Sequence, residues 1–162
     1  MMKHDLSCWP LVLSFSQGAP SLDDLQQYSF AWTEWFERGE RFAVLRILLD
    51  HRAQEHPPGG ALARKTWLSS HGDRLKAQVV GLATVAPADG LEHMNKIKAD
   101  RLFGVPAQAF GGVNEALAWV LPLLAQEATG LEPEGLTPQV LARCQSMRAS
   151  FIAETQEATH AQ

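Results

Sequence analysis

Apolar and polar positions alternate with two different periods along the chain, and the two periods predict strands and helices in turn. Over residues 10–18, apolar side chains occupy every second position, which is typical of a strand that buries one face more than the other. Nearly continuous apolar runs over 41–50 and 78–86 predict two strands that are covered on both faces. A shorter strand is expected over 105–110.

Helical periodicity separates these strands. After Ser21, whose hydroxyl can cap the first turn of a helix, bulky apolar residues recur at steps of three and four. Further helices are predicted over 61–72, 89–104 and 115–127, each with a glycine or a capping residue at one end. A last amphipathic helix begins at Thr137-Pro138, and we expect its polar end to fray.

Strands and helices therefore alternate at intervals of about 25–30 residues, the spacing of crossover units. We expect an α/β fold with a four-stranded, mainly parallel sheet flanked by helices, and an extra C-terminal helix. Residues 1–129 form the domain in this interpretation, and residues 130–162 form a linker and the amphipathic helix. That helix can dock on its own domain or on a second chain. We favour a homo-oligomer, formed through Val140, Cys144, Met147 and Phe151.

Composition excludes several classes of protein. With 14 Lys+Arg against 18 Asp+Glu and no basic block, the chain has no electrostatic footprint for nucleic acid. The longest apolar stretch, 116–125, is far shorter than the roughly 18–20 residues of a membrane span. The first residues carry Asp5 and no apolar signal core, so we expect a cytoplasmic protein. Cys8 falls in a start expected to be disordered, and Cys144 lies on an apolar stripe as a buried structural thiol.

The loop after the 41–50 strand holds the strongest candidates for ligand chemistry, because ligands of open parallel sheets lie beyond the carboxyl ends of the strands. One of its histidines would act as a general base or metal ligand, oriented by a neighbouring carboxylate. In the simpler interpretation the loop is solvated, its aspartate caps backbone N–H groups, and its glycine pair is only a turn rather than an anion cradle. The candidate ligand-binding residues are Asp50, His51, Arg52, His56, Gly59 and Gly60.

Sequence motifs for catalysis and metal binding are missing. The histidines have no His-x-x-x-His or Glu-x-x-His spacing, and the serines stand in no Gly-x-Ser-x-Gly elbow. We therefore expect no metal, assign no cofactor and no catalytic residue, and favour a non-enzymatic protein.

The first predicted helix is unusually aromatic. Trp32, Trp35 and Phe36 exceed what one buried helix face normally needs. Most of these rings should lie in the core, but we expect part of this surface, with Trp32 and Trp35, to remain exposed as a contact for a protein partner or an apolar ligand.

Four segments of the chain carry a resemblance to a known family. They are Leu49-Asp50 after a strand, Trp67 in the next helix, Val80-Gly81-Leu82-Ala83 in a strand and Asn114-Glu115-Ala116-Leu117-Ala118-Trp119 in a helix. Over residues 9–124, their order resembles the STAS-like proteins, small bacterial domains akin to anti-sigma factor antagonists that share features with CRAL-TRIO lipid-transfer domains. In phosphorylatable members, the resemblance implies a serine, the target of a kinase partner, at the position of Gly59 or Gly60. Glycine has no hydroxyl to phosphorylate.

Three functions follow as expectations. The first is a non-enzymatic protein-interaction or regulatory adaptor of the STAS-like type that lacks the phosphoacceptor serine. The second is a module that binds a small molecule or lipid in an apolar pocket beneath the helix that carries Leu91 and Phe103. The third is a small accessory enzyme that uses the loop from Asp50 to His56.

Overall fold

A five-stranded mixed sheet forms the centre of the structure, a computed structural model that describes residues 1–96, 99–127 and 132–161. The strands are arranged in sequence order across the sheet. The first pairs with the second in the antiparallel sense, and all the other pairs are parallel. The strands are β1 (Met2–Asp5), β2 (Leu11–Ser16), β3 (Phe42–Leu48), β4 (Val79–Val85) and β5 (Ala107–Phe110).

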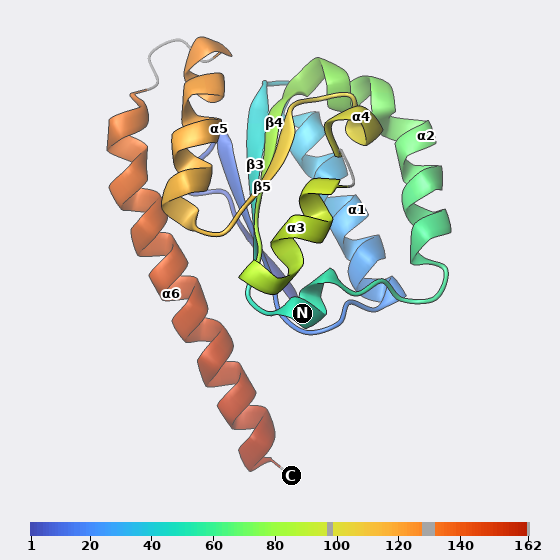
Figure 1. The fold of residues 1–162 in the computed structure, drawn as a ribbon, viewed down its shortest axis with the longest axis vertical. Coiled ribbons are helices and arrows are strands. Elements are labelled where there is room, and N and C mark those ends of the chain that lie inside the picture. The colour runs from blue at the N-terminus through green and yellow to red at the C-terminus, as the bar shows by residue number, and fades with distance from the viewer. Residues whose placement is uncertain (97–98, 128–131, 162) are drawn as a thin grey trace.

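Helices cover both faces of the sheet, with α1 to α4 on one side and α5 and α6 on the other (Figure 1). Connections between successive parallel strands have one handedness, so the helices within them fall on the same face. The last two helices follow the final strand and close the opposite face. The helices are α1 (Leu22–Glu37), the 3-10 turn η1 (His51–Gln54), α2 (Gly60–Gln78), α3 (Ala88–Lys96), α4 (Ala99–Phe103), α5 (Val113–Glu127) and α6 (Pro133–His160).

The α/β class predicted from the periodicity is confirmed, whereas the predicted number of four strands is wrong. The additional strand, β1, lies in the segment expected to be disordered, and Cys8 just after it is buried. A short polar edge strand carries no periodic apolar signal, and it forms only because β2 offers a partner for its backbone. Within the described ranges, every helix is too short or too polar to cross a membrane.

Several helix boundaries also differ from those predicted. Helix α2 continues through Gly72 to Gln78, directly before β4. The helix predicted over 89–104 is divided into α3 and α4, and residues 97–98 between them lie outside the described residues. Helix α6 begins at Pro133 rather than at Thr137 and continues to His160 instead of fraying. The first part of the predicted linker, up to residue 131, is not described.

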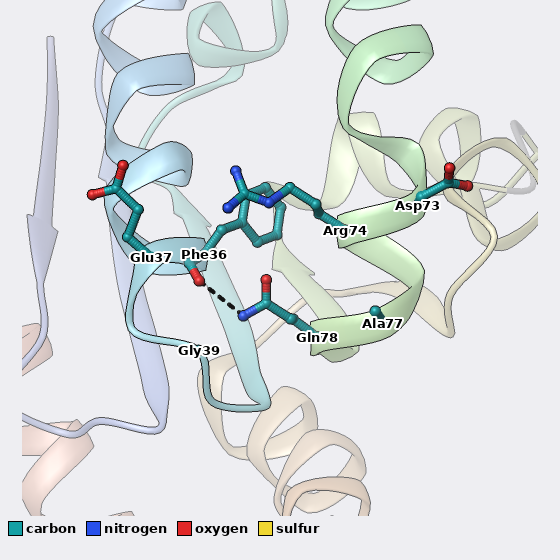
Figure 2. A pocket seen from close by; sticks show the side chains of 7 residues that line it. All are labelled: Phe36, Glu37, Gly39, Asp73, Arg74, Ala77 and Gln78. Carbon is teal, nitrogen blue, oxygen red and sulfur yellow. Dashed lines mark hydrogen bonds between the residues drawn. The ribbon is translucent and has the colours of Figure 1, made fainter.

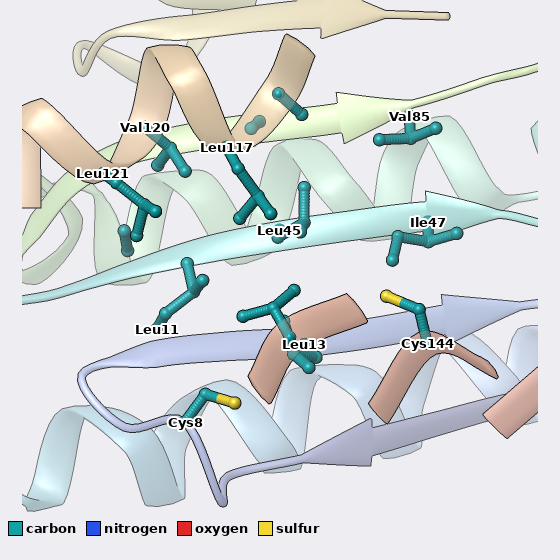
Figure 3. Close-up of a cluster of buried hydrophobic side chains, with 14 of the residues drawn as sticks. Cys8, Leu11, Leu13, Leu45, Ile47, Val85, Leu117, Val120, Leu121 and Cys144 are labelled. Carbon is teal, nitrogen blue, oxygen red and sulfur yellow. The ribbon is translucent and has the colours of Figure 1, made fainter. Parts of the chain in front are cut away.

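The face of the sheet toward α5 and α6 is the larger apolar core (Figure 3). Leu13 and Leu45 are completely buried there, opposite Leu117 and Val120 of α5. On this face β3 places only Ala43, Leu45 and Ile47, and the one polar residue within β3, Arg46, lies on the opposite face.

The apolar stripe of α6 belongs to the same core. Val140, Cys144 and Phe151 are 0%, 5% and 1% exposed, and Met147 packs partly buried beside them. The stripe therefore docks on its own domain, and these side chains are not available as the surface of a homo-oligomer. The expectation of self-association through this stripe is wrong, because the uncovered sheet face offers the helix a nearer apolar partner.

Polar contacts fix the position of α6 against the edge strand. Lys3 of β1 donates to Ser150 Oγ at 2.9 Å and pairs with Glu154, and its Nζ lies 5.0 Å from the centre of the Phe151 ring. Two residues further along β1, on the same face, Asp5 lies 3.8 Å from the Nε of Arg143. The polar sequence of β1 thus complements the helix that covers it.

The second core, between α1, α2 and the sheet, is aromatic. Trp32 and Trp35 are 7% and 2% exposed, so the expectation that they remain exposed is wrong. The ring of Trp32 lies 5.7 Å from that of Trp67 on α2, and Phe36 stacks on His71 at 6.5 Å. Two aromatic helices packed on one sheet face need more rings than a single helix does.

The docking of α6 predicts a large difference between two neighbouring residues. Phe151→Ala removes a completely buried ring and should lower the free energy of unfolding by about 3–5 kcal/mol. Ile152→Ala removes a side chain that is 57% exposed and should change it by less than about 0.5 kcal/mol. Urea denaturation of the two variants measures both values, and equal losses would contradict the docked position of α6.

Candidate functional site

The carboxyl ends of β2 and β3 meet at Asp50, the first of the predicted ligand-binding residues. Its carboxylate accepts hydrogen bonds from the backbone N–H of Ala53 at 2.9 Å and from that of Gly18 at 3.1 and 3.2 Å. One bond caps η1, and the others tie this turn to the turn after β2. The carboxylate is therefore committed to backbone amides, as in the simpler interpretation of the loop, and does not orient a histidine.

The other polar residues of the loop do not form one site. His51 lies 3.9 Å from Asp89 of α3, and both side chains are exposed. Arg52 pairs at 3.7 Å with Glu55 within the loop. His56 faces a different environment, because burial and then the positive charges of Arg64 and Arg46 lower its pKa. The two histidines have different neighbours and no shared carboxylate.

Gly59 and Gly60 are explained by the turn into α2. Gly59 has φ +83°, a left-handed conformation that side chains other than glycine rarely adopt. A Cβ at Gly60 would lie 3.1 Å from Pro57 Cδ and 3.3 Å from Leu25 Cδ1. The glycine pair thus allows α2 to begin in close contact with α1.

Beside this loop lies a polar row that the sequence analysis missed. His4, Ser14, Arg46 and Thr84 are consecutive partners in the register of β1 to β4, so they share one face of the sheet. It is the face toward α1 and α2, where Val44 lies in the aromatic core. The only signal in the sequence was that single polar residues interrupt two apolar strands, Ser14 in β2 and Arg46 in β3.

His4 closes one end of this polar row as a neutral side chain. Its Nδ1 lies 3.0 Å from the Oγ of Ser14, which is 1% exposed. Its ring stacks on Tyr28 at 5.4 Å and meets the edge of Trp35 at 5.2 Å. Burial lowers the pKa of His4 from 6.5 to about 4, so the imidazole is uncharged at neutral pH.

Arg46 is the charged member of the row. It is partly buried in the central strand, and its guanidinium carbon lies 5.9 Å from the centre of the Tyr28 ring. Among residues 1–96, 99–127 and 132–161, it forms neither an ion pair nor a hydrogen bond through its side chain. Buried or partly buried arginines are normally paired, so its five donors are available to a ligand.

The first half of α2, which lies beside these residues, is largely exposed to solvent. All positions from 61 to 66 are exposed, and Leu62 is 69% exposed. A cleft of about 530 Å³ follows this half of the helix, lined by Ala61, Arg64, Lys65, Leu68 and Ser69. The exposed half of α2, the cleft along it and the polar row together form the candidate functional site. This site lies at the carboxyl edge of the sheet.

A second cleft, of about 650 Å³, lies at the opposite ends of α1 and α2 (Figure 2). Its polar groups are engaged within the protein. Gln78 Nε2 donates at 2.9 Å to the carbonyl oxygen of Phe36, near the end of α1, and Arg74 lies over the Phe36 ring at 5.6 Å. This cleft is explained as the junction between the two helices.

The pocket expected beneath the third predicted helix is not among these clefts. Met94 of α3 packs there against the buried residues Leu48, Ala53 and Ala86. Within the described part of the chain, no three His, Cys, Asp or Glu side chains are grouped to hold a metal ion. Comparisons of the chain with protein-family models, with curated proteins and with solved structures find no match in any of the three.

The capping role of Asp50 can be tested by stability. Asp50→Ala leaves the N–H groups of Gly18 and Ala53 without their acceptor and should lower the free energy of unfolding by about 0.5–2 kcal/mol. Asp89→Ala, which removes a 68% exposed carboxylate, should change it by less than about 0.5 kcal/mol. Chemical denaturation gives both values. An unchanged stability for Asp50→Ala would contradict the cap.

The environment of His4 predicts a pH-dependent stability. The unfolded chain binds a proton near pH 6.5 and the folded chain only near 4, so stability is lost as pH falls between these values. His4→Gln should flatten this part of the profile, whereas His93→Gln, at an exposed position of α3, should not. Melting temperatures measured between pH 7 and pH 4 test this, and a wild-type slope retained in His4→Gln would refute the assignment.

Proposed function

We propose that this chain is a non-enzymatic protein-interaction module of the STAS-like type, and that it binds an acidic partner protein through the outward face of α2. The observation that carries the proposal is the exposed first half of this helix, with Leu62 69% exposed on it. Because residues 61–66 of this helix are all exposed, the apolar side chain of Leu62 is uncovered, at a free energy cost that a partner removes.

The composition of this surface supports a close contact. Leu22 of α1, 50% exposed, lies over Gly59, with its Cδ1 3.8 Å from the place of a Cβ. Leu62 and Ala63 follow within one turn of α2. Two exposed leucines around small residues make a flat apolar patch that a partner's helix can approach.

Charge identifies the kind of partner. Residues 56–72 carry Arg64 and Lys65 and no acidic residue, in a chain whose net charge is −4. A basic segment favours a partner with an acidic surface and disfavours pairing with the same segment of a second copy.

The resemblance to STAS-like proteins supports the same surface. In phosphorylatable members the switch lies at the start of the corresponding helix, and here Gly59 and Gly60 stand at that position. The proposed module therefore engages its partner without phosphorylation, and its docking surface is permanently available.

Affinity purification of the full chain from the cells that produce it tests the proposal. One stoichiometric acidic partner should be recovered by the wild type, and Leu62→Glu should weaken its binding at least about tenfold. Phe30→Glu is the matched control, because Phe30 is 64% exposed on α1, two turns beyond Leu22. Binding of the purified partner, measured by calorimetry, should be unchanged in this control. Equal binding to Leu62→Glu and the wild type would overturn the proposal.

A further inference from the structure

Arg46 lies at the Tyr28 ring, and the contact between α1 and α2 indicates where Arg64 lies relative to it. Gly60 lies against Leu25, and seven residues later Trp67 lies 5.7 Å from Trp32. Arg64, between them on α2, belongs to the same helix face because residues three and four apart are neighbours on a helix. It therefore lies at the level of Tyr28 on α1.

Arg46 reaches this level from the sheet. Its register partners Ser14 and Thr84 place it on the face beneath the two helices, and its guanidinium lies at the Tyr28 ring. His56 stands on the loop between these two elements, and after burial the charges of Arg64 and Arg46 are the causes that lower its pKa. Two arginines, from β3 and α2, are thus placed toward the same part of α1, with His56 on the connecting loop.

These charges repel one another and are not compensated within the protein. In the described part of the chain, neither Arg46 nor Arg64 lies within ion-pair distance of a carboxylate. The nearest carboxylate in the sequence, Asp50, is committed to backbone amides. An anion bound between the partly buried Arg46 and the exposed Arg64 would relieve the repulsion between their charges.

We propose that Arg46, His56 and Arg64 together bind the phosphate group of a small molecule, between β3 and the first turns of α2. Two guanidinium groups offer the paired donors that match phosphate oxygens, and a doubly charged anion compensates two arginines where a carboxylate compensates one. Arg64 also lines the cleft of about 530 Å³ along α2, which leaves room beside this arginine for the rest of a small ligand. The proposed interaction also draws on the charge of Arg64, but it depends on Leu62, which this site does not use.

Titration of the full chain with inorganic phosphate and with glycerol 3-phosphate tests the site. Binding is followed by nuclear magnetic resonance at neutral pH, with sodium chloride keeping the ionic strength constant. Arg46→Met and Arg64→Met should each weaken phosphate binding at least about tenfold. Arg74→Met should leave it unchanged within about twofold. This control removes the same charge from the same helix, and Arg74 also lies over an aromatic ring, that of Phe36.

Several results would overturn the inference. These are shifts that do not saturate, equal weakening by Arg74→Met, or acetate binding as tightly as phosphate. If Arg46→Met fails to fold, Arg64→Met decides, because Arg64 is exposed and its removal leaves the core intact. Glycerol 3-phosphate should bind at least about threefold more tightly than inorganic phosphate. Equal affinities would overturn the assignment to a phosphorylated molecule in favour of the free ion.

Discussion

The burial of β2 and β3 on both faces is the constraint on which the rest of the structure depends. Every residue of β2 is buried, and so is every residue of β3 except Arg46. A sheet of this kind is stable only when helices cover both sides. The crossover helices all fall on one side, so the other side must be closed by α5 and α6, and the long C-terminal helix is drawn into the core as a consequence.

The same constraint explains why α2 can leave half its length uncovered. From Trp67 onward it supplies Trp67, His71 and Leu75 to the aromatic core, which is enough to close the sheet around Phe42 and Val44. Its first half lies beside the carboxyl edge, where the turn at Asp50 is held by hydrogen bonds and by the packing of Ala53. Binding surfaces commonly occur where the fold does not need the residues for its own stability.

The features that depend on local periodicity and capping could be predicted from the sequence. The features that depend on the pairing register of distant strands could not. The strands over 41–50 and 78–86, the Ser21 cap and the backbone-capping role of Asp50 follow from nearby residues, and the structure has them all. The apolar stripe of α6 was predicted, but it packs on its own domain and not on a second chain. An apolar stripe alone does not specify which surface it covers. The short edge strand β1 and the row from His4 to Thr84 depend on pairing between distant segments, which no local pattern encodes.

The polar row shows how the two ends of one sheet face come to differ. Toward the amino ends of the strands, Phe42 packs among the rings of Trp32, Trp35 and Phe36. Toward the carboxyl ends, Ser14 is satisfied by His4, whose burial keeps it neutral. Arg46 has no such partner in the described chain and remains charged. Since a neutral residue at this place would cost less free energy in folding, the retained charge supports the proposed anion site.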